Sequence, residues 1–378
     1  MRGWFFLFIL CPLLCQAGVR QDLAALYPEQ SSATLEQRIA LLNSPNDFFR
    51  AFGPYFYLRA KKNLLNVEPW KSLKGHQGWC AGDAHPKNFG VLLSERNQPL
   101  YSINDVDDSN PCPVIADVLR FLTGWGLIVG DDLSTAWLPP YLAGLEGRPL
   151  QPPAIVRQLM EKGRERGLAP KSKWVDPKTG AFRPLDELSP VNGPLAVEIS
   201  QQAQRIAGPG WEILELRERL RMEGGSGGLK RFLILLKGPK NVLKRQPLLL
   251  EFKEIAPRPA TAVLDVPRLD PQARISHAWK WEQGPSVTRW HRFARIAGHL
   301  MMSRPLWDGN VDIDVEKMSF SERQGLALYQ ASLLGWLHRQ GAVPADFADD
   351  LKQVPTEAWT KSLHLLVREM NAAYTEVR

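Results

Sequence analysis

Cysteine is scarce in this sequence, and a long apolar run is missing. The 378 residues include 4 cysteines, and none of them has the CxxC spacing of a structural zinc site. The main apolar run, 4–14, is well short of the roughly 20 residues that a transmembrane helix needs, so we expect no transmembrane anchor. No repeat of fixed period is visible, which disfavours a solenoid. At roughly 150 residues per domain, the length predicts two domains or one two-lobed domain.

The composition is that of a globular protein with a modest excess of positive charge. Hydrophobic residues make up 44% and charged residues 23%, which excludes collagen, coiled coil and wholesale disorder. Lysine and arginine number 47 against 40 acids, a net charge of +7. This excess suits an anionic partner such as a phosphate, a nucleic acid or a membrane surface. Nucleic acid is disfavoured because no interleaving of aromatic and basic residues accompanies the charge.

The N-terminus has the features of a secretory signal. Met1 and Arg2 give a positive start, the apolar run follows, and Cys15-Gln16-Ala17-Gly18 offers small residues for cleavage. We therefore expect residues 1–17 to be a signal peptide and the protein to be exported, in the periplasm, or cytoplasmic if the signal is not used. A lipoprotein signal acylated at Cys15 is the weaker alternative, because leucines precede that cysteine where small residues are expected.

Two cysteines, Cys80 and Cys112, remain after such a cleavage. In an oxidising compartment they invite a disulfide. The alternative is a pair of buried free thiols that act as small hydrophobic residues, and the sequence does not choose between the two.

The order of patterns along the chain predicts an α+β protein. We expect a helical lobe over 18–210, a β-rich nucleotide lobe over 211–320, and C-terminal helices over 321–378 that return to the helical lobe. Ser44-Pro45 divides residues 33–63 into two expected helices, and the proline-rich stretch 131–210 predicts short helices with long connections. The other expected elements are a hairpin made by 78–93 and 99–108, strands at 232–236 and 247–255, and helices at 114–129, 287–302, 322–340 and 357–377.

The segment 82–88, GDAHPKN, is the most informative in the chain. An aspartate at 83, an asparagine five residues later at 88 and a further acid, Asp105, after a strand can supply a base beside a hydroxyl and two oxygen ligands for magnesium. These are the parts that phosphoryl transfer requires. The alternative interpretation is an Asx-rich turn in which these side chains cap the backbone.

This segment resembles the catalytic loop of aminoglycoside-phosphotransferase-like and protein-kinase-like proteins. The wider pattern is similar to an uncharacterised bacterial family, domain of unknown function 2252. That resemblance extends over most of the chain after residue 17, and its supporting segments are 44–50, 103–108, 117–120, 249–254 and 335–338.

The kinase resemblance implies a role for each residue of the segment. Asp83 would be the catalytic base that orients or deprotonates the acceptor, and Asn88 with Asp105 would hold Mg²⁺. Asp107 and Asp108 are further candidate metal ligands. The resemblance places His85 as a support for the loop. It implies that Asp117 accepts hydrogen bonds from the backbone of that loop without touching substrate.

A glycine run and a strand lysine supply the other half of a nucleotide site. The glycines are Gly224, Gly225, Gly227 and Gly228, and Lys253 follows on a strand. Backbone amides in such a loop approach phosphates closely, and a strand lysine neutralises the α and β phosphates. The alternative for the glycines alone is a flexible linker between lobes.

The usual glutamate partner of the strand lysine is not evident. Glu254 and Glu282 are candidates, whereas the predicted helix over 287–302 offers arginines where an acid is expected. The catalytic-loop segment also precedes the glycine run, so the resemblance implies a two-lobed kinase-like fold with circularly permuted lobe order. That order requires Lys253 to lie near Asp105 within one cleft.

The leading functional hypothesis is a kinase-like phosphotransferase or nucleotide-binding protein that uses Mg²⁺ and ATP with an unknown acceptor. Export argues against a supply of ATP and leaves turnover open. The alternative is an exported, non-catalytic module that binds an anionic envelope ligand through a basic cluster formed by Lys237, Lys240, Lys244 and Arg245. A metal-dependent phosphoester hydrolase that uses Asp83, His85, Asn88 and Asp105 ranks last, because two-metal sites need further His and Asp motifs.

Overall fold

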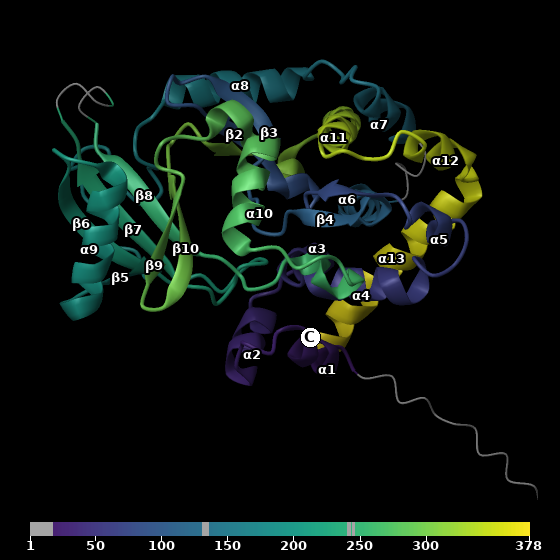
Figure 1. Ribbon diagram of the computed structural model, residues 1–378, viewed down its shortest axis with the longest axis horizontal. Helices are drawn as coiled ribbons and strands as arrows, with labels where there is room; N and C mark the ends of the chain where they lie inside the picture. The colour runs from purple at the N-terminus through teal and green to yellow at the C-terminus, as the bar shows by residue number, and fades with distance from the viewer. Residues whose placement is uncertain (1–17, 131–135, 240–242, 244–245) are drawn as a thin grey trace, which may run out of the picture.

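A helical body and an antiparallel sheet lie side by side in the computed structural model (Figure 1). The structure describes residues 18–130, 136–239, 243 and 246–378. This mixture of helices and separate antiparallel sheets confirms the α+β class. The expected signal peptide at 1–17 and the basic residues Lys240, Lys244 and Arg245 lie outside the described residues.

The helical body is built around α6, whose apolar sequence buries every residue from Val114 to Gly126. Helix α11 packs closely against α7 because glycines face each helix: a Cβ on Gly335 would lie 2.1 Å from the Tyr141 carbonyl oxygen. The helices of the body are α1 (Val19–Leu26), α2 (Ser32–Ala40), α3 (Pro45–Ala51), α4 (Gly53–Asn63), α5 (Trp70–Leu73), α6 (Val114–Val129), α7 (Leu138–Leu145), α8 (Ala154–Arg166), α11 (Phe320–Gln340), α12 (Phe347–Gln353) and α13 (Thr356–Val377). The predicted helices at 114–129, 322–340 and 357–377 are confirmed.

Two small sheets are set into the body. The predicted hairpin is confirmed where β2 (Phe89–Leu93) pairs with β3 (Pro99–Ile103), and β11 (Val311–Asp312) joins the other edge of β2. The strand that precedes the hairpin, β1 (Gln77–Cys80), instead pairs with β4 (Asn110–Pro113). The loops that carry Asp83 and Asp105 therefore run between the two small sheets.

The larger sheet is antiparallel throughout, in the order β5-β6-β7-β8-β10-β9. Both faces of its central strands are apolar because both are covered. Phe232 and Ile234 pack toward α9 (Gly193–Ala207), and Leu233 and Leu235 pack on the other face with Trp174. Its strands are β5 (Leu188–Pro190), β6 (Glu212–Arg219), β7 (Arg231–Lys237), β8 (Leu248–Glu254), β9 (Arg292–Ile296) and β10 (His299–Pro305), and β7 and β8 confirm the two predicted strands.

Two predictions of local structure are wrong. The helix expected over 287–302 is the β9–β10 hairpin. Its turn holds Ala297 and Gly298 at φ values of 49° and 81°, which an α-helix does not allow. Residues 33–63 form three helices instead of two, because the chain breaks again at Phe52, before Gly53-Pro54.

Segments between the sheet and the body complete the fold. They are α10 (Pro271–Ala278), a π-helical turn at Trp279–Gln283, and 3-10 turns at Pro86–Asn88, Ala260–Leu264, Gly284–Ser286 and Val315–Lys317. Within the described ranges, no helix combines the length and the apolar character needed to cross a bilayer.

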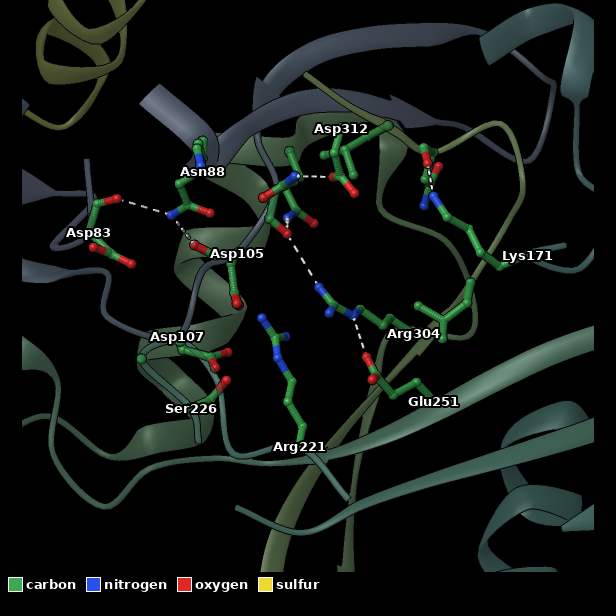
Figure 2. A pocket seen from close by; sticks show the side chains of 18 of the residues that line it. Asp83, Asn88, Asp105, Asp107, Lys171, Arg221, Ser226, Glu251, Arg304 and Asp312 are labelled. Atoms are coloured by element: carbon green, nitrogen blue, oxygen red, sulfur yellow. Dashed lines mark hydrogen bonds and ion pairs between the residues drawn. The ribbon is translucent and has the colours of Figure 1, made fainter. Parts of the chain in front are cut away.

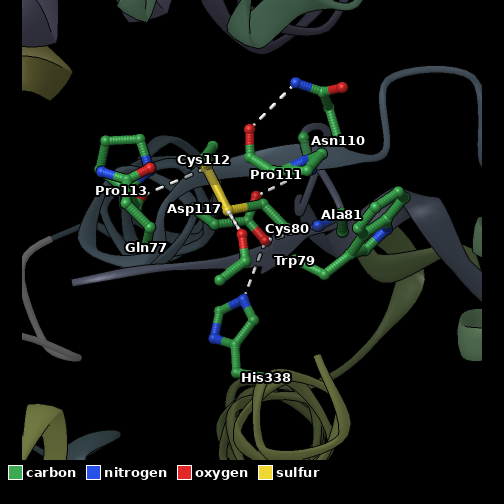
Figure 3. The surroundings of a disulfide bond; sticks show 12 residues. Gln77, Trp79, Cys80, Ala81, Asn110, Pro111, Cys112, Pro113, Asp117 and His338 are labelled. Carbon is green, nitrogen blue, oxygen red and sulfur yellow. Dashed lines mark hydrogen bonds and ion pairs between the residues drawn. A yellow bond between two sulfur atoms is a disulfide. The ribbon is translucent and has the colours of Figure 1, made fainter. Parts of the chain in front are cut away.

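A disulfide joins Cys80 to Cys112 and links β1 to β4 (Figure 3). Both cysteines are fully buried. This decides between the two interpretations that the sequence left open, in favour of the disulfide. Cys80 lies shortly before Asp83 in the sequence, and Cys112 lies shortly after the segment 105–108. The disulfide therefore fixes the spacing of the two acidic segments.

Candidate active site between the sheet and the helical body

A cavity of about 490 Å³ opens between the sheet and the helical body (Figure 2). Most of the predicted site residues line it, from both sides. From the body they are Asp83, His85, Asn88, Asp105 and Asp107, and from the sheet side they are Gly224 and Gly225. Sequence segments more than a hundred residues apart thus meet at one cavity.

The backbone of the Asp83 loop is held by a buried carboxylate. Asp117 accepts hydrogen bonds from the backbone N–H of Ala81, at 2.8 Å, and of Gly82, at 3.0 Å. This confirms the contact expected for Asp117. Gly82 has a φ of 73°, and a Cβ there would lie 2.0 Å from the Asp108 carbonyl oxygen, so only glycine fits.

A chain of buried polar groups holds Asp117 in turn. His338 on α11 has its Nε2 3.0 Å from an Asp117 oxygen, and its Nδ1 is 2.6 Å from the Tyr141 hydroxyl. Because the carboxylate only accepts, His338 donates from Nε2 to Asp117. The loop is therefore fixed by residues that never reach the cavity (Figure 3 shows the Asp117 and His338 side chains).

Asp83 itself is paired with a fully buried arginine. Arg120 on α6 donates from Nε to Asp83 Oδ1 at 2.9 Å and also from Nη2, and its guanidinium lies 4.2 Å from the centre of the Phe49 ring. His85 Nε2 is 3.4 Å from the other Asp83 oxygen. Burial alone would raise the pKa of Asp83, but Arg120 and His85 outweigh it and hold that pKa below its ordinary value. Burial lowers the pKa of His85.

Asn88 ties the two acidic segments together. Its side-chain N–H groups donate to the backbone oxygens of Asp83, at 3.1 Å, and of Asp105, at 3.3 Å. Its side-chain oxygen accepts no hydrogen bond from any residue that the structure describes, so it remains available as a ligand. A structural role and a ligand role are thus compatible in this one residue.

Lys253 lies between two carboxylates of the body. Its Nζ is 2.7 and 2.8 Å from the two oxygens of Asp105 and also pairs with Asp107. The expected proximity of Lys253 and Asp105 is confirmed. Lys253 is fully buried beneath the residues that line the cavity.

The pKa values of Asp105 and Asp107 shift in opposite directions at this position. Burial would raise the pKa of Asp105, but Lys253 and Arg304 outweigh burial and lower it. For Asp107, burial and the neighbouring Asp105 charge outweigh Lys253, so its pKa is raised. The charged form is therefore favoured at Asp105 and disfavoured at Asp107, although Lys253 lowers the pKa of both.

An arginine group that the sequence analysis missed forms the sheet side of the site. Glu251 accepts from Arg231 at 3.1 Å and from Arg304 at 2.9 Å. The side chain of Arg221 forms no hydrogen bond or ion pair with any described residue. Burial, followed by repulsion from Arg231 and Arg219, lowers its pKa to about 10. Its side chain extends toward Asp105 and Asp107 (Figure 2).

The sequence contains a signal for one part of this arginine group, Arg221. Residues 217, 219 and 221 are arginines at every second position, which places them on one face of an extended segment.

The glycine run meets the cavity with only part of its length. Gly224 and Gly225 line it, whereas Gly227 and Gly228 do not. The Gly227 amide donates to the Gly224 oxygen at 3.1 Å and the Gly228 amide to the Arg221 oxygen at 2.9 Å, so both amides are used within the turn. The Ser226 hydroxyl lines the cavity and accepts from Arg231 at 2.5 Å.

The oxygen donors of the site fit a hard cation. No group of three or more His, Cys, Asp or Glu side chains in the described ranges is arranged to hold a metal ion. Two carboxylates and an amide oxygen are nevertheless present at Asp105, Asp107 and Asn88, and Asp107 Oδ1 is buried without a hydrogen bond. Mg²⁺ prefers such oxygen ligands and usually keeps water or phosphate in its remaining positions.

Neither candidate glutamate partner contacts Lys253. Glu254 accepts from the Lys230 backbone N–H at 2.9 Å and lies 2.6 Å from His299. Glu282 lies in the buried π-helical turn, where burial raises its pKa well above the ordinary value. Asp105 and Asp107 take the place that a glutamate was expected to fill.

In comparisons with known proteins, one segment of the chain matches a family model. No curated protein and no solved structure matches the chain. Residues 35–134, which include Asp83, Asn88, Asp105 and Asp107, match the model of a family described as an uncharacterized protein conserved in bacteria (DUF2252). This confirms the sequence resemblance for that segment; the supporting segments 249–254 and 335–338 lie outside the match.

Proposed function

We propose that the cavity binds a nucleotide, ATP, with Mg²⁺ and transfers a phosphoryl group to an acceptor presented to Asp83. The observation that carries this proposal is the buried contact of Lys253 with Asp105 and Asp107 beside the unpaired Arg221. It brings a lysine from the sheet and two carboxylates from the body to one point. Phosphoryl transfer requires cations for the phosphates and oxygen ligands for a divalent ion in the same small space.

The charges on the sheet side support a phosphate ligand. Arg221 faces the cavity without an acidic partner, and its lowered pKa reports a position where positive charge is costly. A phosphate oxygen placed there would remove that cost, since hydrogen bonds between ionised groups are roughly twice as strong as neutral ones. The backbone amides of Gly224 and Gly225, which donate to no residue that the structure describes, add donors at the cavity wall.

Apolar side chains in the cavity lining suit a nucleotide base. The lining includes apolar side chains from both sides, among them Leu93, Trp174 and Leu306. The volume of about 490 Å³ lies within the ordinary range of small-molecule sites, roughly 300–1,000 Å³. Charged and apolar side chains in one cavity supply contacts for the two halves of a nucleotide.

Each group of residues in the cavity has its own role in the proposed reaction. Asp105, Asp107 and the Asn88 side-chain oxygen would hold Mg²⁺, which supplies neutralisation of phosphate charge when bound. Arg221 and the glycine amides bind the phosphates. Asp83, fixed by Arg120, orients the acceptor hydroxyl by accepting its hydrogen bond.

Calorimetry with Mg-ATP on residues 18–378 tests the proposal. We expect saturable binding that Asp105→Asn and Arg221→Gln each weaken at least tenfold. Asp312→Asn is the matched control, because that carboxylate lines the same cavity but is bonded to Asn104 at 3.0 Å. A folded protein that binds no Mg-ATP, or binds it equally well in all three variants, would overturn the proposal.

A second candidate is a non-catalytic module that binds an anionic ligand. Its support is the ion pair with Arg120, which lowers the pKa of Asp83 and makes that carboxylate a weak base. Of its expected basic cluster, the described Lys237 pairs with Glu212 at 3.8 Å. Asp83→Asn separates the two functions: loss of transfer with binding retained supports the kinase, whereas a wild type that binds but never transfers supports the module.

We also propose that the protein works after export. The disulfide between Cys80 and Cys112 favours an oxidising compartment. Fractionation of producing cells, with detection of the cleaved chain, tests this location.

A further inference from the structure

A second cavity adjoins the first on the far side of Asp83. It has a volume of about 230 Å³ and shares five lining residues with the larger cavity. The shared residues are Arg50, Asp83, Asp108, Gly225 and Ala256. The carboxylate of Asp83 thus lies at the junction of two spaces, one of which the proposed function fills with a nucleotide.

Two guanidinium groups face this smaller cavity without a close acidic partner. Arg50 lines both cavities, its ion pair with Asp47 is 4.0 Å long, and its Nε is buried without a hydrogen bond. The carboxylates that line the smaller cavity are those of Glu29, Asp83 and Asp108. Arg258 is exposed and forms no hydrogen bond or ion pair with any residue in the described part of the chain. A guanidinium whose donors are unused and partly buried favours a carboxylate or phosphate ligand.

The remaining walls are compact. They come from α1, the start of α4 and the 3-10 turn Ala260–Leu264, and they include Tyr27, Pro54 and Val263. A volume of about 230 Å³ is below the usual range for drug-sized ligands, roughly 300–1,000 Å³, so the cavity admits only a small molecule.

We propose that this cavity is the acceptor subsite and that it takes a small hydroxylated anion, a compound with a hydroxyl group and one carboxylate or phosphate. The inference rests on the proposed phosphoryl transfer. Arg50 and Arg258 bind the anionic group, which leaves the hydroxyl beside Asp83 at the junction. There the hydroxyl oxygen forms a bond to the γ-phosphorus while the bond from that phosphorus to the β,γ-bridging oxygen breaks. The products are the phosphorylated acceptor and ADP, and the hydroxyl proton is released to solvent.

Calorimetric titration with three small probes tests the subsite. The probes are sn-glycerol 3-phosphate, D-glycerate and glycerol, so that a phosphate, a carboxylate and an uncharged polyol are compared. We expect the wild type to bind at least one of the two anions and not glycerol. Which anion binds more tightly identifies the acceptor's charged group.

Matched substitutions locate the binding. Arg258→Gln should weaken anion binding at least tenfold, whereas Arg268→Gln, an exposed arginine that does not line the cavity, should leave it unchanged. Ala25→Trp places a large side chain at the rim, and Ala24→Trp is its control, because Ala24 is exposed on the same helix but outside the lining. None of the four changes should alter the affinity for Mg-ATP.

The outcomes separate the two proposals. Mg-ATP binding without binding of either anion, or anion binding equal in the wild type, Arg258→Gln and Ala25→Trp, overturns the acceptor subsite and leaves the nucleotide site standing. Anion binding lost in Arg258→Gln with no Mg-ATP binding overturns the phosphotransferase and retains the second cavity as an anion site.

Discussion

Asp83 and Asp105 line one cavity, yet the molecule holds them in opposite ways. The cation of Asp83 is Arg120, which lies 37 residues later within the same helical body. The cation of Asp105 is Lys253, which lies 148 residues later on the sheet. The first pair is therefore an internal brace of the body, whereas the second is a contact between two parts of the molecule. A ligand that competes for Asp105 therefore acts on a contact between those parts.

The largest expected effect comes from removing the internal brace. Arg120→Met leaves Asp83 without its cation in a mostly buried site, and the loss of one partner of a buried pair costs about 3–5 kcal/mol. Urea unfolding of the variant measures this cost. The double variant Arg120→Met/Asp83→Asn should recover part of the loss, since it removes the uncompensated charge, and no recovery would contradict the account of Asp83 as a braced charge.

The disulfide supports both acidic segments, so its removal tests them together. Replacing Cys80 and Cys112 by alanine releases a crosslink over a sequence separation of 32 and should cost about 2–4 kcal/mol. Thermal unfolding with and without a reductant gives the measurement. The reductant should lower the melting temperature of the wild type but not that of the double variant. An equal response in both proteins would show that the disulfide does not form.

The contact between sheet and body should be weaker than the brace. Lys253→Met leaves Asp105 and Asp107 facing each other, but the Asp105 side chain is 34% exposed, so water screens part of the repulsion. We expect a loss of about 1–3 kcal/mol. Added Mg²⁺ should raise the melting temperature of this variant more than that of Arg120→Met, and an equal rise in both would contradict the metal assignment.

A carboxylate without an ion pair gives the smallest effect and the opposite sign. Glu282 is buried, and its raised pKa means that the folded protein binds a proton which the unfolded chain releases above about pH 4.5. Wild-type stability from this group is therefore present at low pH and is lost as pH rises. Glu282→Gln should gain about 1–2 kcal/mol at pH 7 and almost nothing near pH 4. Urea unfolding at both pH values checks this, and a loss of stability at pH 7 would contradict it.

The sequence predicted the fold best where one signal dominated. The apolar run at 114–129 and the glycine-to-strand change before 232 left few alternatives, and both predictions are confirmed. The failure at 287–302 has a local cause. Apolar residues there also fit a helical period. The turn depends on a positive φ at Ala297, and an alanine in the sequence does not indicate that backbone conformation.

The site was predictable for the residues in sequence motifs and for the proximity of Lys253 to Asp105, but not for the pairing of Arg120 with Asp83. Asp83, Asn88 and Asp105 share a recognisable spacing, and Asp117 was expected to hold the loop. The pairing of Arg120 with Asp83 depends on how α6 packs, and the pairing of Lys253 with two aspartates depends on how the sheet meets the body. Those contacts belong to tertiary packing, which the pattern of a single segment does not encode.

The hydrogen bond between His338 and Asp117 also bears on when the Asp83 loop is fully supported during synthesis of the chain. Asp117 fixes the Asp83 loop, but the histidine that orients it lies 221 residues later, on a helix that also supplies Gln330 to the Pro86 oxygen at 3.2 Å. A nascent chain that carries the complete loop still lacks this support. The loop can therefore gain the support of His338 only after residue 338 has been synthesised, whereas the contacts of Asp117 and Arg120 are available much earlier.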